Sequence, residues 1–179
     1  MPNFYQLLEA LQLSLYKPAK WHLSKICEES QNAEYGAGRF ELHGGEHTSV
    51  SGRLRVAKIT PTKIGQFVVF WEKDADNQNQ AFAYDEAPEL LIVHVFHPTT
   101  EESGQFIFPK EVLRKYGVLS TATTTGKMAM RVYPEWDNPH SKQATATQKW
   151  QLPYFVNLGV LNEGEALKEE WKNLHIGLA

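Results

Sequence analysis

Apolar residues in the first part of the chain recur at the spacing of an amphipathic helix. A first helix is predicted over the stretch that holds Phe4, Leu7, Leu8 and Leu11. Pro18 interrupts this pattern. Beyond it, Leu23, Ile26 and Cys27 would share one face of a second helical segment, which the glycines at positions 36 and 38 would end.

Further along, the apolar period changes to two, which is typical of β-strands. Phe40 and Leu42 alternate with Arg39 and Glu41, and the polar, glycine-rich residues 43–52 predict a loop or hairpin turn. Strands are also predicted at residues 54–60, 66–71, 90–96, 105–108 and 127–133. Residues 66–71 and 90–96 are apolar on both faces, so we expect both strands to be central and buried.

Proline and glycine delimit further helices in the second half of the chain. Pro109 would open one helix and Gly117 would end it. Asn138 followed by Pro139 is typical of an N-cap and a first-turn proline, which predicts a helix running to about Leu152. A last amphipathic helix is predicted within residues 159–179.

The order of these elements indicates the fold class. Helices come first, a cluster of strands follows, and the remaining strands alternate with helices. This order predicts an α/β (α+β) fold with a mixed central β-sheet flanked by helices. We expect one domain over residues 1–158, with residues 159–179 as a helical extension packed on it.

Composition excludes several classes of protein. Apolar residues make up 42% and charged residues 22% of the 179 positions, which is a globular rather than a disordered balance. A single cysteine, Cys27, excludes an intrachain disulfide and a cysteine-based zinc site, and we expect it to be buried. No apolar run is long enough to span a bilayer and no secretory signal is evident, so a cytoplasmic protein without a membrane partner is expected.

Charge is unevenly distributed along the chain. The net charge of −3 excludes a strongly basic protein but not a local basic face. Residues 51–73 hold five basic side chains and one acidic one, residues 74–102 hold seven acidic side chains and no Lys or Arg, and residues 105–151 hold seven basic and three acidic side chains. The two basic segments could form one positive groove, or they could belong to a mixed solvated surface.

Acidic residues of the first half suggest one kind of chemistry. Glu29, Glu34 and Glu41 precede Lys58 on neighbouring predicted elements. Carboxylates of this kind can hold Mg²⁺, and a lysine can stabilise the negative charge that develops when a phosphodiester is cleaved. The alternative is a set of surface salt bridges.

Two later segments suggest binding rather than cleavage. Period two places Lys127, Arg131 and Tyr133 on the same face of a strand, which suits a phosphate backbone and a base or sugar. The alternative is an edge strand protected by charge. On the following helix, Gln143, Thr147 and Gln151 form a polar stripe that could contact bases, or merely a solvated face.

Histidine shows no metal-ligand spacing. His94 lies in an apolar run, and we expect a core histidine whose ring nitrogens are hydrogen-bonded.

Four segments together resemble the MepB family. They are residues 34–42, residues 55–68 with the block Ala-Lys-Ile-Thr-Pro-Thr-Lys-Ile-Gly, residues 126–136 and residues 142–155. Their order and spacing match across roughly residues 14–158. The resemblance implies a fold similar to that of type II restriction endonucleases and tRNA-splicing endonucleases, with a groove for nucleic acid.

Enzymes of that fold carry a helix acid, a strand acid and an acid-x-Lys triplet. The resemblance implies that Glu41 is the strand acid, that Val56-Ala57-Lys58 stands at the triplet, and that Glu29 or Glu34 is the helix acid. Val56 departs from the pattern because its side chain cannot ligate a metal. Either the metal is held differently or the fold binds without cutting.

We therefore expect a nucleic-acid-binding protein, for DNA or RNA, with an endonuclease-like fold and an incomplete metal centre. The expected contact residues are Lys58, Lys63, Lys127 and Arg131 for phosphates and Tyr133, Gln143 and Thr147 for bases or sugars. One alternative is an active Mg²⁺- or Mn²⁺-dependent nuclease that uses Glu29 or Glu34, Glu41 and Lys58, with Glu34 and Glu41 as the candidate metal ligands. Another is a module that binds a small anionic ligand or a protein. The oligomeric state stays open.

Overall fold

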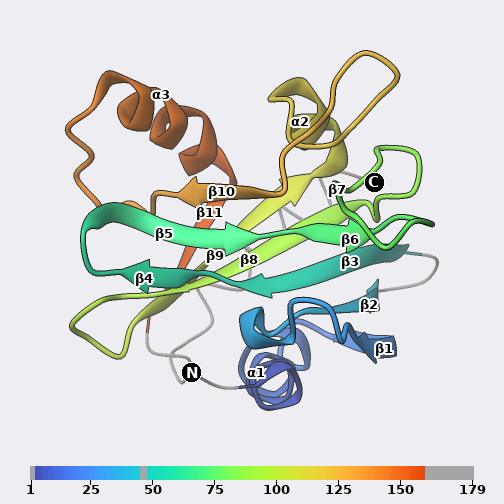
Figure 1. Ribbon diagram of the computed structural model, residues 1–179. Helices are drawn as coiled ribbons and strands as arrows, with labels where there is room; N and C mark the ends of the chain where they lie inside the picture. Colours follow the sequence, from blue (N-terminus) through green and yellow to red (C-terminus); the bar gives the residue numbers. More distant parts are fainter. Residues whose placement is uncertain (1–2, 45–47, 160–179) are drawn as a thin grey trace.

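The computed structural model describes residues 3–44 and 48–159, which are built around a six-stranded mixed β-sheet (Figure 1). From one edge to the other, its strands are β1 (Trp21–Glu28), β2 (Gly38–Gly44), β3 (Thr48–Val56), β8 (Leu90–Phe96), β9 (Ser103–Pro109) and β11 (Phe155–Gly159). β3 pairs with β8 in parallel, and the other neighbours pair antiparallel. The predicted mixed central sheet is therefore confirmed.

A second, smaller sheet carries the basic segments. Its order is β10-β5-β4, formed by β10 (Ala129–Val132), β5 (Lys63–Val69) and β4 (Lys58–Thr60). A hairpin of β6 (Trp71–Lys73) and β7 (Asn79–Ala81) follows β5. Polar residues, 74–78, connect β6 to β7.

Helices lie on both sides of these sheets (Figure 1). The helical elements are α1 (Phe4–Leu11), the π-helix η1 (Gln12–Tyr16), the 3₁₀ turns η2 (Ala33–Tyr35) and η3 (Leu152–Tyr154), α2 (Lys110–Lys115) and α3 (Lys142–Gln151). α1 begins with a capping box, in which the Asn3 side chain accepts from the Gln6 N–H and the Gln6 side chain accepts from the Asn3 N–H. The predicted first helix is confirmed.

The alternation of β8 explains how the layers pack. Leu90 and Ile92 belong to a core cluster shared with α1, whereas Leu91, Val93 and Val95 belong to a second cluster shared with β5 and β10. β8 is therefore buried on both faces, as its apolar run predicts. β5 is central in its own sheet, but Phe67 and Val69 are only partly buried, so the expectation of burial on both faces is wrong for this strand.

The second predicted helix is wrong, because residues 21–28 form the edge strand β1. β1 pairs with β2, and its register shifts between Ser24 and Cys27, where Lys25 has a φ of 48°. This β-bulge breaks the period of two, so apolar residues recur at a helix-like spacing in an extended strand. Cys27 is exposed, which contradicts the expectation of a buried thiol.

α3 begins later than predicted. Its N-cap is Ser141, whose Oγ accepts from the Ala144 N–H at 3.1 Å. Asn138 and Pro139 therefore precede the helix rather than open it. The predicted helix within residues 159–179 lies outside the described residues, apart from Gly159, which ends β11. Among the described helices, none has the length and apolar character needed to cross a membrane.

His94 is fully buried in β8, as expected, but its hydrogen-bonding differs from the expectation. Neither ring nitrogen has a hydrogen-bond partner within the described residues. The ring meets Phe96 edge to face, with 4.7 Å between centroids. Burial lowers the pKa of His94 from 6.5 to about 3, because the charged imidazolium would be desolvated there.

Candidate functional site

A groove of about 370 Å³ lies between β10 and α3, and we call it the α3–β10 groove. Five of the seven predicted contact residues line it: Lys127, Arg131, Tyr133, Gln143 and Thr147. The other lining residues are Val118, Ala129, Met130, Ser141, Ala144, Trp150 and Gln151. Within residues 3–44 and 48–159, the lining therefore contains two cations, hydroxyl groups and amides, and no carboxylate.

The free edge of β10 faces this groove. The Phe70 N–H donates to the Met128 carbonyl, so the backbone groups of residues 129, 131 and 133 point away from β5. Gln151 covers part of that edge: its Oε1 accepts from the Tyr133 N–H at 3.0 Å and its Nε2 donates to the Arg131 carbonyl at 2.9 Å. Gln151 is fully buried, so the third member of the predicted polar stripe is a structural residue.

Arg131 extends across the small sheet. Its guanidinium donates to the Gly65 carbonyl at 2.8 Å and to the Thr60 Oγ1 at 2.9 Å. Arg131 and Lys58 both stand directly opposite Phe67, one on each neighbouring strand. These three side chains therefore share one face, which places two cations in a row across β10, β5 and β4.

Tyr133 packs closely on the turn that begins β5. Gly65 has a φ of 84°, and a Cβ built there would lie 2.5 Å from the Tyr133 ring. Tyr133 is itself only 8% exposed. Its ring therefore forms part of the wall of the α3–β10 groove rather than a freely exposed stacking surface.

Lys127 and the first turns of α3 form the more exposed side of the groove. Lys127 is exposed, and its Nζ lies 3.5 Å from the Tyr116 carbonyl. Gln143 is exposed as well, whereas the Thr147 hydroxyl donates to the Gln143 carbonyl at 2.9 Å. Trp150 stacks on Tyr116, with 4.2 Å between ring centroids, which anchors the helix.

The two remaining predicted contact residues lie outside the groove. Lys58 forms a salt bridge of 2.8 Å with Glu34, and its Nζ lies 4.0 Å from the centre of the Tyr35 ring. Lys63 is exposed at the start of β5.

The predicted metal ligands do not come together. Glu34 pairs with Lys58. Glu41 pairs with Lys25 at 2.7 Å. No group of three or more His, Cys, Asp or Glu side chains suited to a metal ion is found within residues 3–44 and 48–159. The residues present therefore do not fit the Mg²⁺ or Mn²⁺ centre that the resemblance implies.

Glu29 lies instead among three arginines. One carboxylate oxygen is 3.3 Å from the Arg39 Nε and 3.1 Å from the Arg53 Nε, and the other is 2.6 Å from the Arg55 Nη2. Burial lowers the pKa of Arg55 to about 10, although Glu29 acts in the opposite direction. These contacts make Glu29 a counter-ion to arginine, which opposes its assignment as a ligand for a cation.

The sequence analysis did not find this arginine cluster. The missing information was the pairing of β2 with β3, which places Arg39 directly opposite Arg53. An Arg-x-Arg spacing on a strand was the available signal, because alternate residues share a face.

Comparisons with known proteins agree with this architecture. The family model described as MepB-like matches residues 29–157. A solved structure, the crystal structure of MepB, is similar with a TM-score of 0.70 and 37% sequence identity, over 88% of this chain and 97% of the MepB chain. No curated protein matches the sequence. The similarity to restriction endonucleases stays a prediction, but the family is shown: the chain belongs to the MepB-like family.

Proposed function

We propose that the α3–β10 groove binds the sugar–phosphate backbone of a nucleic acid. The observation that carries this proposal is the composition of the lining, which has Lys127 and Arg131 but no carboxylate from the described residues. A groove with one sign of charge attracts the opposite charge, and nucleic-acid backbones are contacted mainly by Lys, Arg and uncharged hydrogen-bonding side chains. Such a local surface is compatible with a net charge of −3 for the whole chain.

Cationic side chains beside the groove could contact a nucleic-acid strand that extends beyond it. Lys58 and Arg131 lie two strands apart on one face of the small sheet. Neighbouring strands are about 4.8 Å apart, so their Cα atoms are separated by on the order of 10 Å. Lys63 is exposed at the start of β5. A backbone leaving the groove past Arg131 would meet these two lysines.

A binding assay with a charge reversal tests the groove. Gln143→Glu introduces a negative charge at an exposed lining position, whereas Ala146→Glu introduces it at an exposed position of α3 outside the lining. Fluorescence anisotropy would be measured with labelled single-stranded DNA, duplex DNA and RNA at two salt concentrations. We expect Gln143→Glu to weaken binding and Ala146→Glu to leave it near the parent value, with affinity falling as salt rises.

A second pair of variants tests the contribution of Lys127 to binding. Lys127→Ala removes a lining lysine, and Lys149→Ala removes an exposed lysine of α3 that does not line the groove. We expect the Lys127 variant to reduce the slope of log affinity against log salt by about 0.7–0.9, the value for one phosphate contact. Equal affinities for both variants, or no binding of any of the three nucleic acids, would contradict the proposal.

The same samples address the nuclease alternative. Each nucleic acid would be incubated with Mg²⁺, Mn²⁺ or EDTA, and the products separated by length. Binding without cleavage supports a protein that only binds. Cleavage that EDTA and Glu41→Ala both abolish would support a nuclease instead.

A further inference from the structure

A second pocket, of about 280 Å³, lies where the arginines surround Glu29, and we call it the arginine pocket. It is lined by Cys27, Glu28, Glu29, Ser30, Gln31, Arg39, Arg53, Trp71, Glu72 and Phe82. Arg55 lies beneath it, bonded to Glu29. The α3–β10 groove shares no lining residue with this pocket.

The cluster under the pocket has an excess of positive charge. Three guanidinium groups lie within 4.0 Å of the Glu29 carboxylate, and no other carboxylate described by the structure approaches them that closely. Arg39 and Arg53 are also direct cross-strand neighbours, an arrangement that is unfavourable for like charges. Within 4.0 Å, three guanidinium groups therefore share one carboxylate.

These guanidinium groups also retain hydrogen-bond donors. Glu29 contacts Arg39 and Arg53 through their Nε atoms, and their terminal nitrogens have no hydrogen bond with any other described residue. Arg53 is 5% exposed, and its Nε is buried without a partner of hydrogen-bonding geometry in the described part of the chain. Its guanidinium lies 3.6 Å from the centre of the Phe82 ring, which holds it in place.

We propose that the arginine pocket binds a phosphate monoester group through Arg39 and Arg53. A phosphate dianion would supply two more negative charges to the three guanidinium groups that share the Glu29 carboxylate, and guanidinium groups bind phosphate oxygens through paired hydrogen bonds. A carboxylate would supply only one. The volume of about 280 Å³ leaves room for a small organic group beside the phosphate, against Trp71.

Two further carboxyl groups, those of Glu28 and Glu72, line the pocket, and neither forms a salt bridge with an arginine of the cluster in the described part of the chain. Glu28 is exposed and forms no salt bridge within the described residues. Burial raises the pKa of Glu72, although Arg53 acts in the opposite direction. The raised pKa lowers the free-energy cost of protonating Glu72 beside a bound anion.

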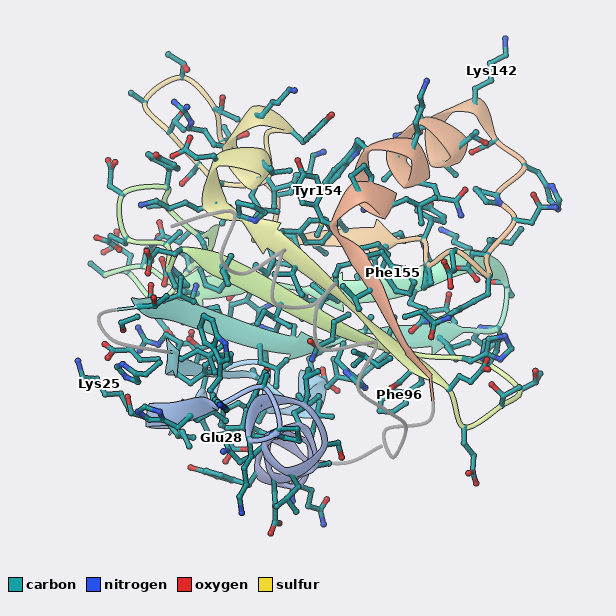
Figure 2. The ribbon with its side chains drawn as sticks, turned by 180° about the vertical axis from the view of Figure 1, so that it is seen from behind. Lys25, Glu28, Phe96, Lys142, Tyr154 and Phe155 are labelled. Carbon is teal, nitrogen blue, oxygen red and sulfur yellow. The ribbon has the colours of Figure 1, made fainter. Side chains whose placement is uncertain are left out.

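The arginine pocket and the α3–β10 groove can be tested separately because they lie on opposite sides of the molecule. Figure 2 shows Glu28, a pocket residue, at the side that carries α1 and Lys25, whereas Lys142, at the start of α3, projects from the far end. Figure 1 shows the same separation of β1 from α3. A variant of one site should leave the other intact.

Calorimetric titration with inorganic phosphate and with glycerol phosphate tests the proposal, at constant ionic strength set with chloride. Arg39→Gln is the test variant, since its side chain is 58% exposed and its loss should not unfold the protein. Arg114→Gln is the control, because Arg114 is similarly exposed and pairs with Glu111 elsewhere. We expect saturable binding to the parent and to the control, and binding weakened about tenfold or more in Arg39→Gln.

Two results would overturn the proposal: no saturable binding of either phosphate to the parent, or equal binding to Arg39→Gln and the parent. The source of the phosphate is resolved by a 5′-phosphorylated oligonucleotide and its 5′-hydroxyl counterpart. A preference for the phosphorylated strand that Arg39→Gln removes identifies a strand end as the ligand. Binding of glycerol phosphate without such a preference identifies a small phosphate ester.

Discussion

The side-chain oxygen of Gln151 accepts a hydrogen bond from the backbone N–H of Tyr133, with 3.0 Å between the two atoms. The amide nitrogen of the same side chain donates to the Arg131 carbonyl at 2.9 Å. One side chain of α3 thus occupies the place of a neighbouring strand along β10. This contact fixes the end of α3 against the strand that supplies the floor of the α3–β10 groove.

Replacing Gln151 should destabilise the fold. Gln151→Leu keeps an apolar body but leaves the Tyr133 N–H and the Arg131 carbonyl without their partner. Each unsatisfied buried group costs about 1–3 kcal/mol. Urea unfolding should show a loss in this range or above it, whereas Gln143→Leu, at an exposed position of the same helix, should be near neutral. Equal losses for both variants would contradict the role assigned to Gln151.

Glu29 should matter for stability because it is the counter-ion of two buried arginines. Glu29→Gln leaves Arg53 and Arg55 without a negative partner, and breaking a buried ion pair costs about 3–5 kcal/mol. Glu111→Gln is the matched control, since its pair with Arg114 is exposed and is worth at most about 1 kcal/mol. Chemical denaturation of both variants measures the difference. A Glu29 variant as stable as the Glu111 variant would show that the cluster does not need its carboxylate.

Gly65 should not tolerate a side chain. Gly65→Ala places a Cβ 2.5 Å from the Tyr133 ring at a φ of 84°. Gly159 has a φ of 58°, and no other described residue lies within 4 Å of a Cβ built there, so Gly159→Ala is the variant for the backbone cost. That cost is of order 1–3 kcal/mol. Thermal unfolding should show a larger loss for Gly65→Ala, and the excess should shrink when Tyr133→Ala is combined with it.

His94 should make the protein sensitive to acid. Its pKa is about 3 in the fold and 6.5 otherwise, so the unfolded chain binds more protons than the native protein between these values. Above pH 6.5, His94 is neutral in both states and does not lower the free energy of unfolding. As the pH falls from 6.5 toward 3, the free energy of unfolding decreases by about 1.4 kcal/mol for each pH unit, because the unfolded histidine is protonated and the buried one is not.

His94→Leu tests this dependence. The variant removes the titrating group, so its free energy of unfolding should fall less steeply than that of the parent between pH 6 and 4. His22→Leu serves as the control because His22 is exposed on β1 and should leave the slope unchanged. Identical slopes for the parent and His94→Leu would rule out His94 as the source of acid sensitivity.

Elements with local signals could be predicted from the amino-acid sequence. α1 follows from the spacing of Phe4, Leu7, Leu8 and Leu11. Pro109 and Gly117 mark the two ends of α2. Proline is tolerated at the start of a helix, and glycine readily adopts the positive φ, here 65°, that follows a helix end. The continuous apolar run of β8 indicated burial on both faces. Lys127, Arg131 and Tyr133 were placed on one face by their spacing in the sequence, and all three line the α3–β10 groove.

Contacts between residues that are distant in the sequence could not be predicted, because they depend on how the elements pack. The bulge at Lys25 exists only where β1 pairs with β2, so the spacing of apolar residues wrongly predicted a helix at β1. The partners of Glu29 and Glu34 come from other strands, and they turn candidate metal ligands into members of ion pairs. Gln151 satisfies β10 only because α3 packs beside it. The sequence shows the charge and the hydrogen-bonding groups of each residue. The distances between these groups decide whether they bind a metal, a phosphate or each other, and those distances are set only by folding.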